Sequence, residues 1–164
     1  MDFIIREITT SEYALLEPFL YEAVFQPDPD NLVPREVTQT PEAKAYYEDF
    51  GRPHDRALLA EVDGRVVGVV WTRIIDGPVK GFGYIDEKTP EFAISLLESY
   101  RGKGIGTKLM QEMLDVLRRH GYARTALSVQ KANYAVRMYK AVGFEIVEER
   151  EDDYLMICEL KVAT

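Results

Sequence analysis

Apolar residues recur at helical spacing in two separate parts of the chain. Ile105, Leu109, Met113 and Val116 would lie on one face of a helix, and the apolar positions of residues 15–24 have the same period. Each pattern leaves the opposite face polar. The sequence therefore predicts two amphipathic helices whose apolar faces are covered by other elements.

A different period marks the segment between them. The β-rich runs over residues 56–62 and 65–75 lie on either side of Asp63-Gly64. An Asp-Gly pair between two such runs is a strong signal for a two-residue β-hairpin. The chain therefore combines amphipathic helices with antiparallel strands.

Helix-capping residues complete the order of elements. Thr40-Pro41 is a typical helix start, and Gly121 and Gly143 each follow an apolar helical run where a left-handed residue is favoured. The order β-α-α-β-β-β-α-β-α-β-β predicts a mixed α/β domain, with an antiparallel front half joined to a parallel β-α-β unit. The predicted elements are a strand (3–8), helices (to about 25, and from 40 to near 51), strands (56–62, 65–75 and 91–97), a helix (104–120), a strand (124–129), a helix (133–142) and two strands (144–149 and 154–160).

Composition restricts the class of protein. The 164 residues are 46% hydrophobic and 29% charged, which is typical of one globular domain, and neither repeat nor linker divides residues 1–164. No apolar stretch approaches the roughly 18 residues of a membrane helix, and no secretory signal is visible, so we expect a cytoplasmic protein. Cys158 is the only cysteine and the two histidines are isolated, so we expect no disulfide and no metal site.

Charge is unevenly distributed. The net charge is −8, which argues against nucleic-acid binding through a general basic face. Residues 1–98 hold 9 basic and 19 acidic side chains, whereas residues 99–145 hold 9 basic and 3 acidic ones. One cationic segment in an acidic chain favours a local anionic ligand. A Lys- and Arg-rich solvated helix face is the alternative.

The glycine-rich run over residues 101–108 carries the clearest chemistry. It lies between a predicted strand and a predicted helix, where glycines expose backbone N–H groups beside the positive end of the helix dipole. Arg101, Lys103 and Lys108 add positive charge. The run lacks the spacing of a Walker A loop, and its three alternating glycines differ from a dinucleotide fingerprint, so a nucleotide-binding protein is disfavoured.

Two motifs give this chain a resemblance to a known family. The R-x-x-G-x-G spacing of Arg101, Gly104 and Gly106 resembles the acetyl-CoA pyrophosphate loop of the GNAT superfamily of N-acetyltransferases. Downstream, Tyr139, three further residues and Gly143-Phe144 are similar to the family's second cofactor motif. The resemblance spans essentially the whole chain and implies the GNAT acyl-CoA N-acyltransferase fold.

The resemblance implies acetyl-CoA as the co-substrate. Two positions depart from the family pattern: Glu98 stands where proline is common, and Asn133 lies six rather than seven residues before Tyr139. The second departure bears on whether Asn133 contacts the pantetheine arm. The implied cofactor-binding residues are Leu96, Leu97, Arg101, Gly102, Lys103, Gly104, Ile105, Gly106, Thr107, Asn133 and Tyr139.

The resemblance further implies direct attack of an amine on the thioester in a ternary complex. We expect Tyr139 to protonate the departing thiolate, since a phenol has a pKa of about 10. We expect Glu91 to accept the amine proton, directly or through a water. Tyr139 could instead serve packing alone and Glu91 could be merely solvated. Glu61, Asp86 and Glu87 are alternative bases.

The acceptor is defined only as a primary amine, in a small molecule or in a peptide or protein. The net −10 of residues 1–98 favours a cationic amine, unless this acidity serves solubility. Neither nucleic acid nor a membrane is an expected partner, and the family allows a homodimer. The competing function is a non-catalytic GNAT-fold sensor of acyl-CoA or an interaction module.

Overall fold

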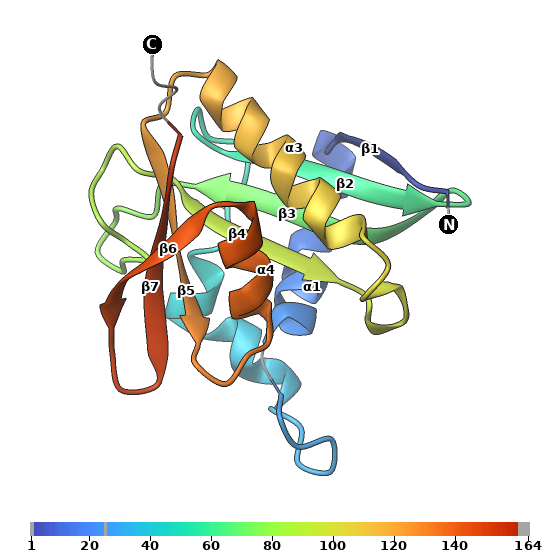
Figure 1. Cartoon of the computed structure of the whole chain (residues 1–164). Coiled ribbons are helices and arrows are strands. Elements are labelled where there is room, and N and C mark those ends of the chain that lie inside the picture. Colours follow the sequence, from blue (N-terminus) through green and yellow to red (C-terminus); the bar gives the residue numbers. More distant parts are fainter. Residues whose placement is uncertain (1, 25, 161–164) are drawn as a thin grey trace.

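The computed structural model describes residues 2–24 and 26–160, and its centre is one twisted sheet of seven strands (Figure 1). The strand order is β1-β2-β3-β4-β5-β7-β6, and every neighbouring pair is antiparallel except β4 with β5. This is the predicted combination of an antiparallel front half and a parallel β-α-β unit. The strands are β1 (Ile4–Glu7), β2 (Arg56–Val62), β3 (Arg65–Arg73), β4 (Glu91–Leu96), β5 (Arg124–Gln130), β6 (Phe144–Glu149) and β7 (Asp153–Glu159).

Helices cover both faces of the sheet, as Figure 1 shows with α3 in front and α1 behind. Successive residues of β2 and β3 are buried along most of each strand. Because side chains of a strand alternate between faces, both faces of these two strands are covered. Leu58 and Val70 pack in the cluster under α3, whereas Leu59 and Val69 pack against α1. The helices are α1 (Leu16–Ala23), α2 (Pro41–Lys44), α3 (Ile105–Arg119) and α4 (Ala135–Val142), with 3-10 turns at η1 (Thr10–Leu15), η2 (Arg35–Gln39) and η3 (Glu98–Tyr100).

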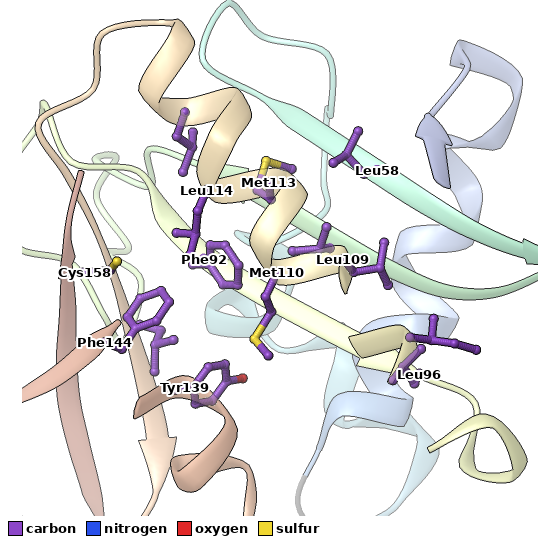
Figure 2. Close-up of a cluster of buried hydrophobic side chains, with 14 of the residues drawn as sticks. Leu58, Phe92, Leu96, Leu109, Met110, Met113, Leu114, Tyr139, Phe144 and Cys158 are labelled. Atoms are coloured by element: carbon purple, nitrogen blue, oxygen red, sulfur yellow. The ribbon is translucent and has the colours of Figure 1, made fainter. Parts of the chain in front are cut away.

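The core under α3 joins the parallel unit to the C-terminal hairpin. Figure 2 shows Met110 and Leu114 of α3 in the same cluster as Phe92 of β4 and Phe144 of β6. The Phe92 and Phe144 rings meet edge to face with their centroids 5.3 Å apart. This packing holds α3, β4 and β6 together in one core.

The β2–β3 hairpin forms as the sequence predicts. Asp63 (φ 50°) and Gly64 (φ 79°) both adopt left-handed backbone angles, as a type I′ turn requires. Its two strands pair from Arg56 with Thr72 to Val62 with Arg65, with a bulge between Ala60 and Glu61.

Helix ends differ from the predicted ones for local reasons. The first predicted helix divides into η1 and α1, because Pro18 has no N–H to donate to the Ala14 carbonyl. The predicted end of this helix, Phe25, lies outside the described residues. The second helix ends at Lys44, and Asp49 (φ 54°) adopts a left-handed angle shortly after it. No helix within 2–24 and 26–160 is long and apolar enough to cross a membrane.

Candidate active site

β4 and β5 separate after their first residues, and a cleft opens beside the gap. Their one registered pair is Glu91 with Ala126, and Figure 1 shows the two strands diverging from there with α4 beside the opening. The cleft has a volume of about 570 Å³. Its lining comes from α1 and the following loop (Glu22, Ala23, Val24, Gln26, Pro29 and Leu32), from β4 (Ile94, Ser95 and Leu96), from η3, the glycine loop and α3 (Glu98, Arg101, Gly102, Gly104, Gly106 and Thr107) and from α4 with the two residues before it (Asn133, Tyr134, Ala135, Met138 and Tyr139).

The glycine loop brings the N-terminus of α3 to the wall of this cleft. Gly102 (φ 72°) and Gly104 (φ 86°) adopt left-handed angles that other residues rarely take. The first helical bond runs from the Lys108 N–H to the Gly104 carbonyl, and no side chain caps the helix. The N–H groups before Lys108 are therefore without intrahelical partners, as an anion-binding helix terminus requires.

The cationic side chains of the loop have separate positions. Arg101 donates from Nε to the Leu96 carbonyl (3.1 Å) and from Nη2 to the Glu22 carbonyl (3.0 Å), so its guanidinium braces the loop against β4 and α1. Lys103 and Lys108 line a neighbouring surface groove beside β1 instead. Their charge raises the local positive potential without lining the cleft.

On the cleft side, β4 has backbone groups that β5 does not pair with and one side chain without a hydrogen-bond partner in the part of the chain that the structure describes. Because β5 leaves β4 after Glu91, the polar backbone groups near Ile94 and Leu96 have no β5 partner, and the Leu96 carbonyl accepts from Arg101 instead. Gly106 lets α3 approach closely, since a Cβ there would stand 3.0 Å from Leu96 Cδ1. The Ser95 hydroxyl is buried and has no hydrogen-bond partner among the described residues.

Tyr139 reaches the cleft from α4. Its ring is 9% exposed and packs edge to face on Phe144, with centroids 5.7 Å apart. Figure 2 shows its hydroxyl turned away from Phe144. Burial raises the pKa of this phenol to about 12. The hydroxyl is therefore protonated at neutral pH and can act as a proton donor.

Asn133 has a local structural role at the start of α4. Its Oδ1 accepts a hydrogen bond from the Ala135 N–H at 2.9 Å. The neighbouring Tyr134 is 64% exposed and also lines the cleft. The side-chain amide nitrogen of Asn133 is the group that remains for a ligand.

Glu91 lies outside the cleft, at the closed end of the β4–β5 pair. Its carboxylate is 6% exposed. Oε2 accepts hydrogen bonds from the Tyr46 hydroxyl and, at 3.1 Å, from the Gly83 N–H. Burial raises the pKa of this carboxyl to about 7, although these two hydrogen bonds lower it. A carboxylate with such a pKa is suited to proton transfer near neutrality.

The structure brings most of the predicted cofactor residues to one place. Leu96, Gly102, Gly104, Thr107 and Tyr139 line the cleft, together with Arg101, Gly106 and Asn133. It does not bring Leu97, Lys103, Ile105 or Glu91 into the lining, and Ile105 is fully buried in the core.

The wall formed by α1, the loop after it and Tyr134 is not among the predicted cofactor-binding residues. The exposed side chains of Leu32 and Tyr134 lie at this wall. No spacing motif marks these residues, because the fold alone brings them together. Among residues 2–24 and 26–160, no group of three or more His, Cys, Asp or Glu side chains is placed to hold a metal ion.

Comparison with known proteins identifies the family. Residues 18–144 match the family model described as "Acetyltransferase (GNAT) family". The chain belongs to the GNAT family. It is a GNAT-superfamily N-acetyltransferase, as its two motifs imply.

Curated relatives cover most of this GNAT domain. An N-alpha-acetyltransferase of Sulfurisphaera tokodaii is 31% identical over 147 residues, which is 81% of this chain and 88% of the relative. An N-alpha-acetyltransferase of Sulfolobus acidocaldarius is 29% identical over 150 residues, with the same shares covered. N-alpha-acetyltransferase 50 of Danio rerio is 30% identical over 114 residues, covering 68% of this chain and 64% of that protein.

Solved structures establish the fold independently of sequence. The protein YncA from Salmonella typhimurium, solved with its cofactor acetyl-CoA, has a TM-score of 0.72 at 20% identity, covering 100% of this chain and 97% of that one. The PaiA N-acetyltransferase from Thermoplasma acidophilum, solved with coenzyme A, has a TM-score of 0.69 at 16% identity, covering 97% and 99%. The chain therefore has the GNAT fold, as predicted.

Proposed function

We propose that this protein transfers the acetyl group of acetyl-CoA to a primary amine by direct attack in a ternary complex. One observation carries the proposal: the open N-terminus of α3, the edge of β4 that β5 leaves uncovered and Tyr139 line the same cleft. The helix terminus would bind the pyrophosphate, and the strand edge would bind the pantetheine arm. The thioester would then lie beside Tyr139. The only cysteine, Cys158, is buried and outside the cleft, which favours direct transfer over an acyl-enzyme.

Tyr139 would act as the general acid. As the amine attacks, the carbon–sulfur bond breaks and the thiolate of coenzyme A needs a proton. A phenol that burial keeps protonated can supply it. Its fixed ring, packed on Phe144, positions the hydroxyl before the substrate arrives.

Glu91 would act as the general base. It lies four residues along β4 from Ser95, a rise of about 13 Å, so the amine proton would reach it through water. Two of the three alternative bases are less suitable. Asp86 pairs with Arg124 at 2.8 Å, and the hydrogen bond from Arg124 is the main cause that lowers its pKa to about 2. Glu61 pairs with Arg6.

The N-terminal α-amine of a peptide is the proposed class of acceptor. The relatives named N-alpha-acetyltransferase support it, because they cover about four fifths of this chain. The α-amine has an ordinary pKa near 8, so a base working near neutrality can deprotonate it.

Coenzyme A release on a panel of amines tests the proposal. The panel contains a peptide with a free α-amine, the same peptide with a blocked N-terminus and an internal lysine, and a polyamine. We expect thiol release with the first, and one acetyl group on its N-terminus by mass spectrometry. Binding of acetyl-CoA without thiol release on any amine would instead indicate a non-catalytic sensor.

The Glu91→Gln variant tests the base on the same assay. The parent rate should rise with pH through about 7, because the carboxyl must lose its proton to act. Glu91→Gln should lose this rise and most of its rate. Equal rates for variant and parent where the amine is protonated would exclude Glu91 as the base.

A further inference from the structure

The two carboxylate oxygens of Glu91 have different surroundings. Oε2 accepts hydrogen bonds from the Tyr46 hydroxyl and the Gly83 N–H. Oε1 is buried, and no described residue donates a hydrogen bond to it. A buried carboxylate oxygen without a donor is costly, so its retention calls for a reason.

Tyr46 is held in place through its main chain. Trp71 donates from Nε1 to the Tyr46 carbonyl at 2.9 Å. Arg73 donates from Nη1 to the carbonyls of Ala45 (3.2 Å) and Glu48 (2.8 Å), on either side of Tyr46. Trp71 and Arg73 are both fully buried on β3. The main chain at Tyr46 is therefore held by side chains of the sheet, independently of the Tyr46 hydroxyl.

The direction of the Tyr46–Glu91 hydrogen bond is also fixed. The Tyr46 oxygen accepts from the Phe82 N–H at 2.8 Å, and its ring stacks on Phe82 with centroids 6.3 Å apart. The one proton of the hydroxyl is thus free to point only to Glu91. On the other side of the carboxylate, a Cβ on Gly81 would stand 1.9 Å from Oε1, so only glycine leaves room there.

We propose that Tyr46 is a positioning residue for acetyl transfer, which holds Oε2 of Glu91 and leaves Oε1 as the oxygen that receives the amine proton. This inference rests on the proposed function, since it requires Glu91 to be the base. The amine N–H bond breaks and its proton passes along a chain of waters, each of which accepts one proton and gives up another, until an O–H bond forms at Oε1. The carboxylic acid later returns the proton to solvent. Tyr46 keeps its own proton throughout.

The charges around Glu91 leave Tyr46 as its main adjustable partner. All three neighbouring cations have ion pairs of their own, and the charge of Arg150 also favours the carboxylate. The pairs are Arg73 with Asp55 before β2, Arg124 on β5 with Asp86, and Arg150 in the β6–β7 turn with Asp153 and Glu148.

The sign of the expected effect follows from the hydrogen bond. The Tyr46 hydroxyl favours the charged form of Glu91 and so lowers its pKa, against the burial that raises it. Removing the hydroxyl therefore raises the pKa of Glu91 further. Burial and the nearby Glu91 charge raise the pKa of Tyr46 itself, so the phenol does not ionise in the working range.

Two measurements on Tyr46→Phe test the proposal. The first is the pKa of Glu91, from the ¹³C carboxyl signal that Glu91→Gln removes. The second is the acid limb of kcat/KM for the peptide amine. We expect both to move upward together by about one pH unit, which is the effect of losing one hydrogen bond to a charged group. At pH values where Glu91 is mostly protonated, kcat/KM should therefore be about tenfold lower than in the parent. Acetyl-CoA affinity should be unchanged, because Tyr46 does not line the cleft.

Tyr122→Phe is the matched control. It also removes one hydroxyl, which hydrogen bonds to His54 Nδ1 at 2.6 Å, and it should move neither quantity. If Tyr46→Phe leaves the pKa of Glu91 or the acid limb in place while the parent turns over, the role of Tyr46 is refuted. If the parent itself transfers no acetyl group, the proposed function fails instead. An acid limb of kcat/KM that moves equally in Tyr122→Phe would also refute a specific role for Tyr46.

Discussion

Tyr139 combines two requirements in one side chain, a packed ring and a hydroxyl that reaches the cleft. Its ring lies in the same cluster as Phe144 and Phe92. The Tyr139→Phe substitution removes the hydroxyl and leaves this packing. We expect kcat to fall by about 100-fold or more, the usual contribution of a general acid, with acetyl-CoA affinity unchanged.

The leaving group provides the control for that prediction. An acetyl thioester of a more acidic thiol needs less protonation, so steady-state rates with such a donor should fall much less in Tyr139→Phe. Turnover equal to that of the parent across the pH range would mean that Tyr139 serves packing only.

The buried ion pair of Arg73 and Asp55 stabilises the segment that carries Tyr46. The two side chains are 2% and 3% exposed, with Nη2 and Oδ2 at 2.9 Å. Arg73→Met leaves the Asp55 carboxylate buried without its partner, and we expect a loss of about 3–5 kcal/mol in the free energy of unfolding. Urea denaturation measures this free energy.

Arg118→Met is the control. It breaks an exposed pair with Asp115 and should cost less than about 1 kcal/mol of the free energy of unfolding. Similar losses in both variants would contradict this account.

Among the helices, strands and turns, the sequence predicts those features that residues adjacent in the chain determine. The Asp63-Gly64 turn and the start of α3 follow from residues adjacent in the chain, and both form as expected. The division of the first helix depends on Pro18, whose missing N–H the apolar period does not report. The closed environment of Glu91 depends on Tyr46 and Gly83, which lie 45 and 8 residues away. No pattern of neighbouring residues in the sequence predicts such contacts.

Gly104 tests the link between the glycine loop and cofactor binding. A Cβ at Gly104 would meet nothing within 4 Å, yet its φ of 86° is strained for alanine. Gly104→Ala should cost about 1–2 kcal/mol of stability and weaken coenzyme A binding about tenfold, because the loop must shift its N–H groups.

Gly64 is the matched position, with φ 79° and equal space in the β2–β3 turn. Gly64→Ala should lose similar stability in thermal unfolding and no affinity in calorimetric titration. Unchanged affinity in Gly104→Ala would remove the loop from the cofactor site.

At the scale of the whole molecule, the parting of two parallel strands produces the site. The antiparallel front half and the β5–β7–β6 half pack under one helix, α3, and meet at Glu91 with Ala126. The order of elements in the sequence predicts that β4 and β5 are parallel neighbours. It does not predict where they separate, since that depends on packing across the sheet.

Charge is also unevenly distributed over the whole molecule. The basic residues 99–145 contain the loop that would bind the diphosphate, whereas Glu22 and Glu98 are the acidic residues among the cleft-lining positions of 1–98. The positive charge near the loop agrees with an anionic cofactor.

A crystal structure of the protein with coenzyme A would show whether this cleft is the cofactor site. We expect pyrophosphate oxygens within hydrogen-bond distance of the backbone N–H groups of residues 102–107, and the thiol between β4 and β5 beside the Tyr139 hydroxyl. Coenzyme A bound at another surface, or this cleft closed by packed side chains while the ligand is bound, would contradict it.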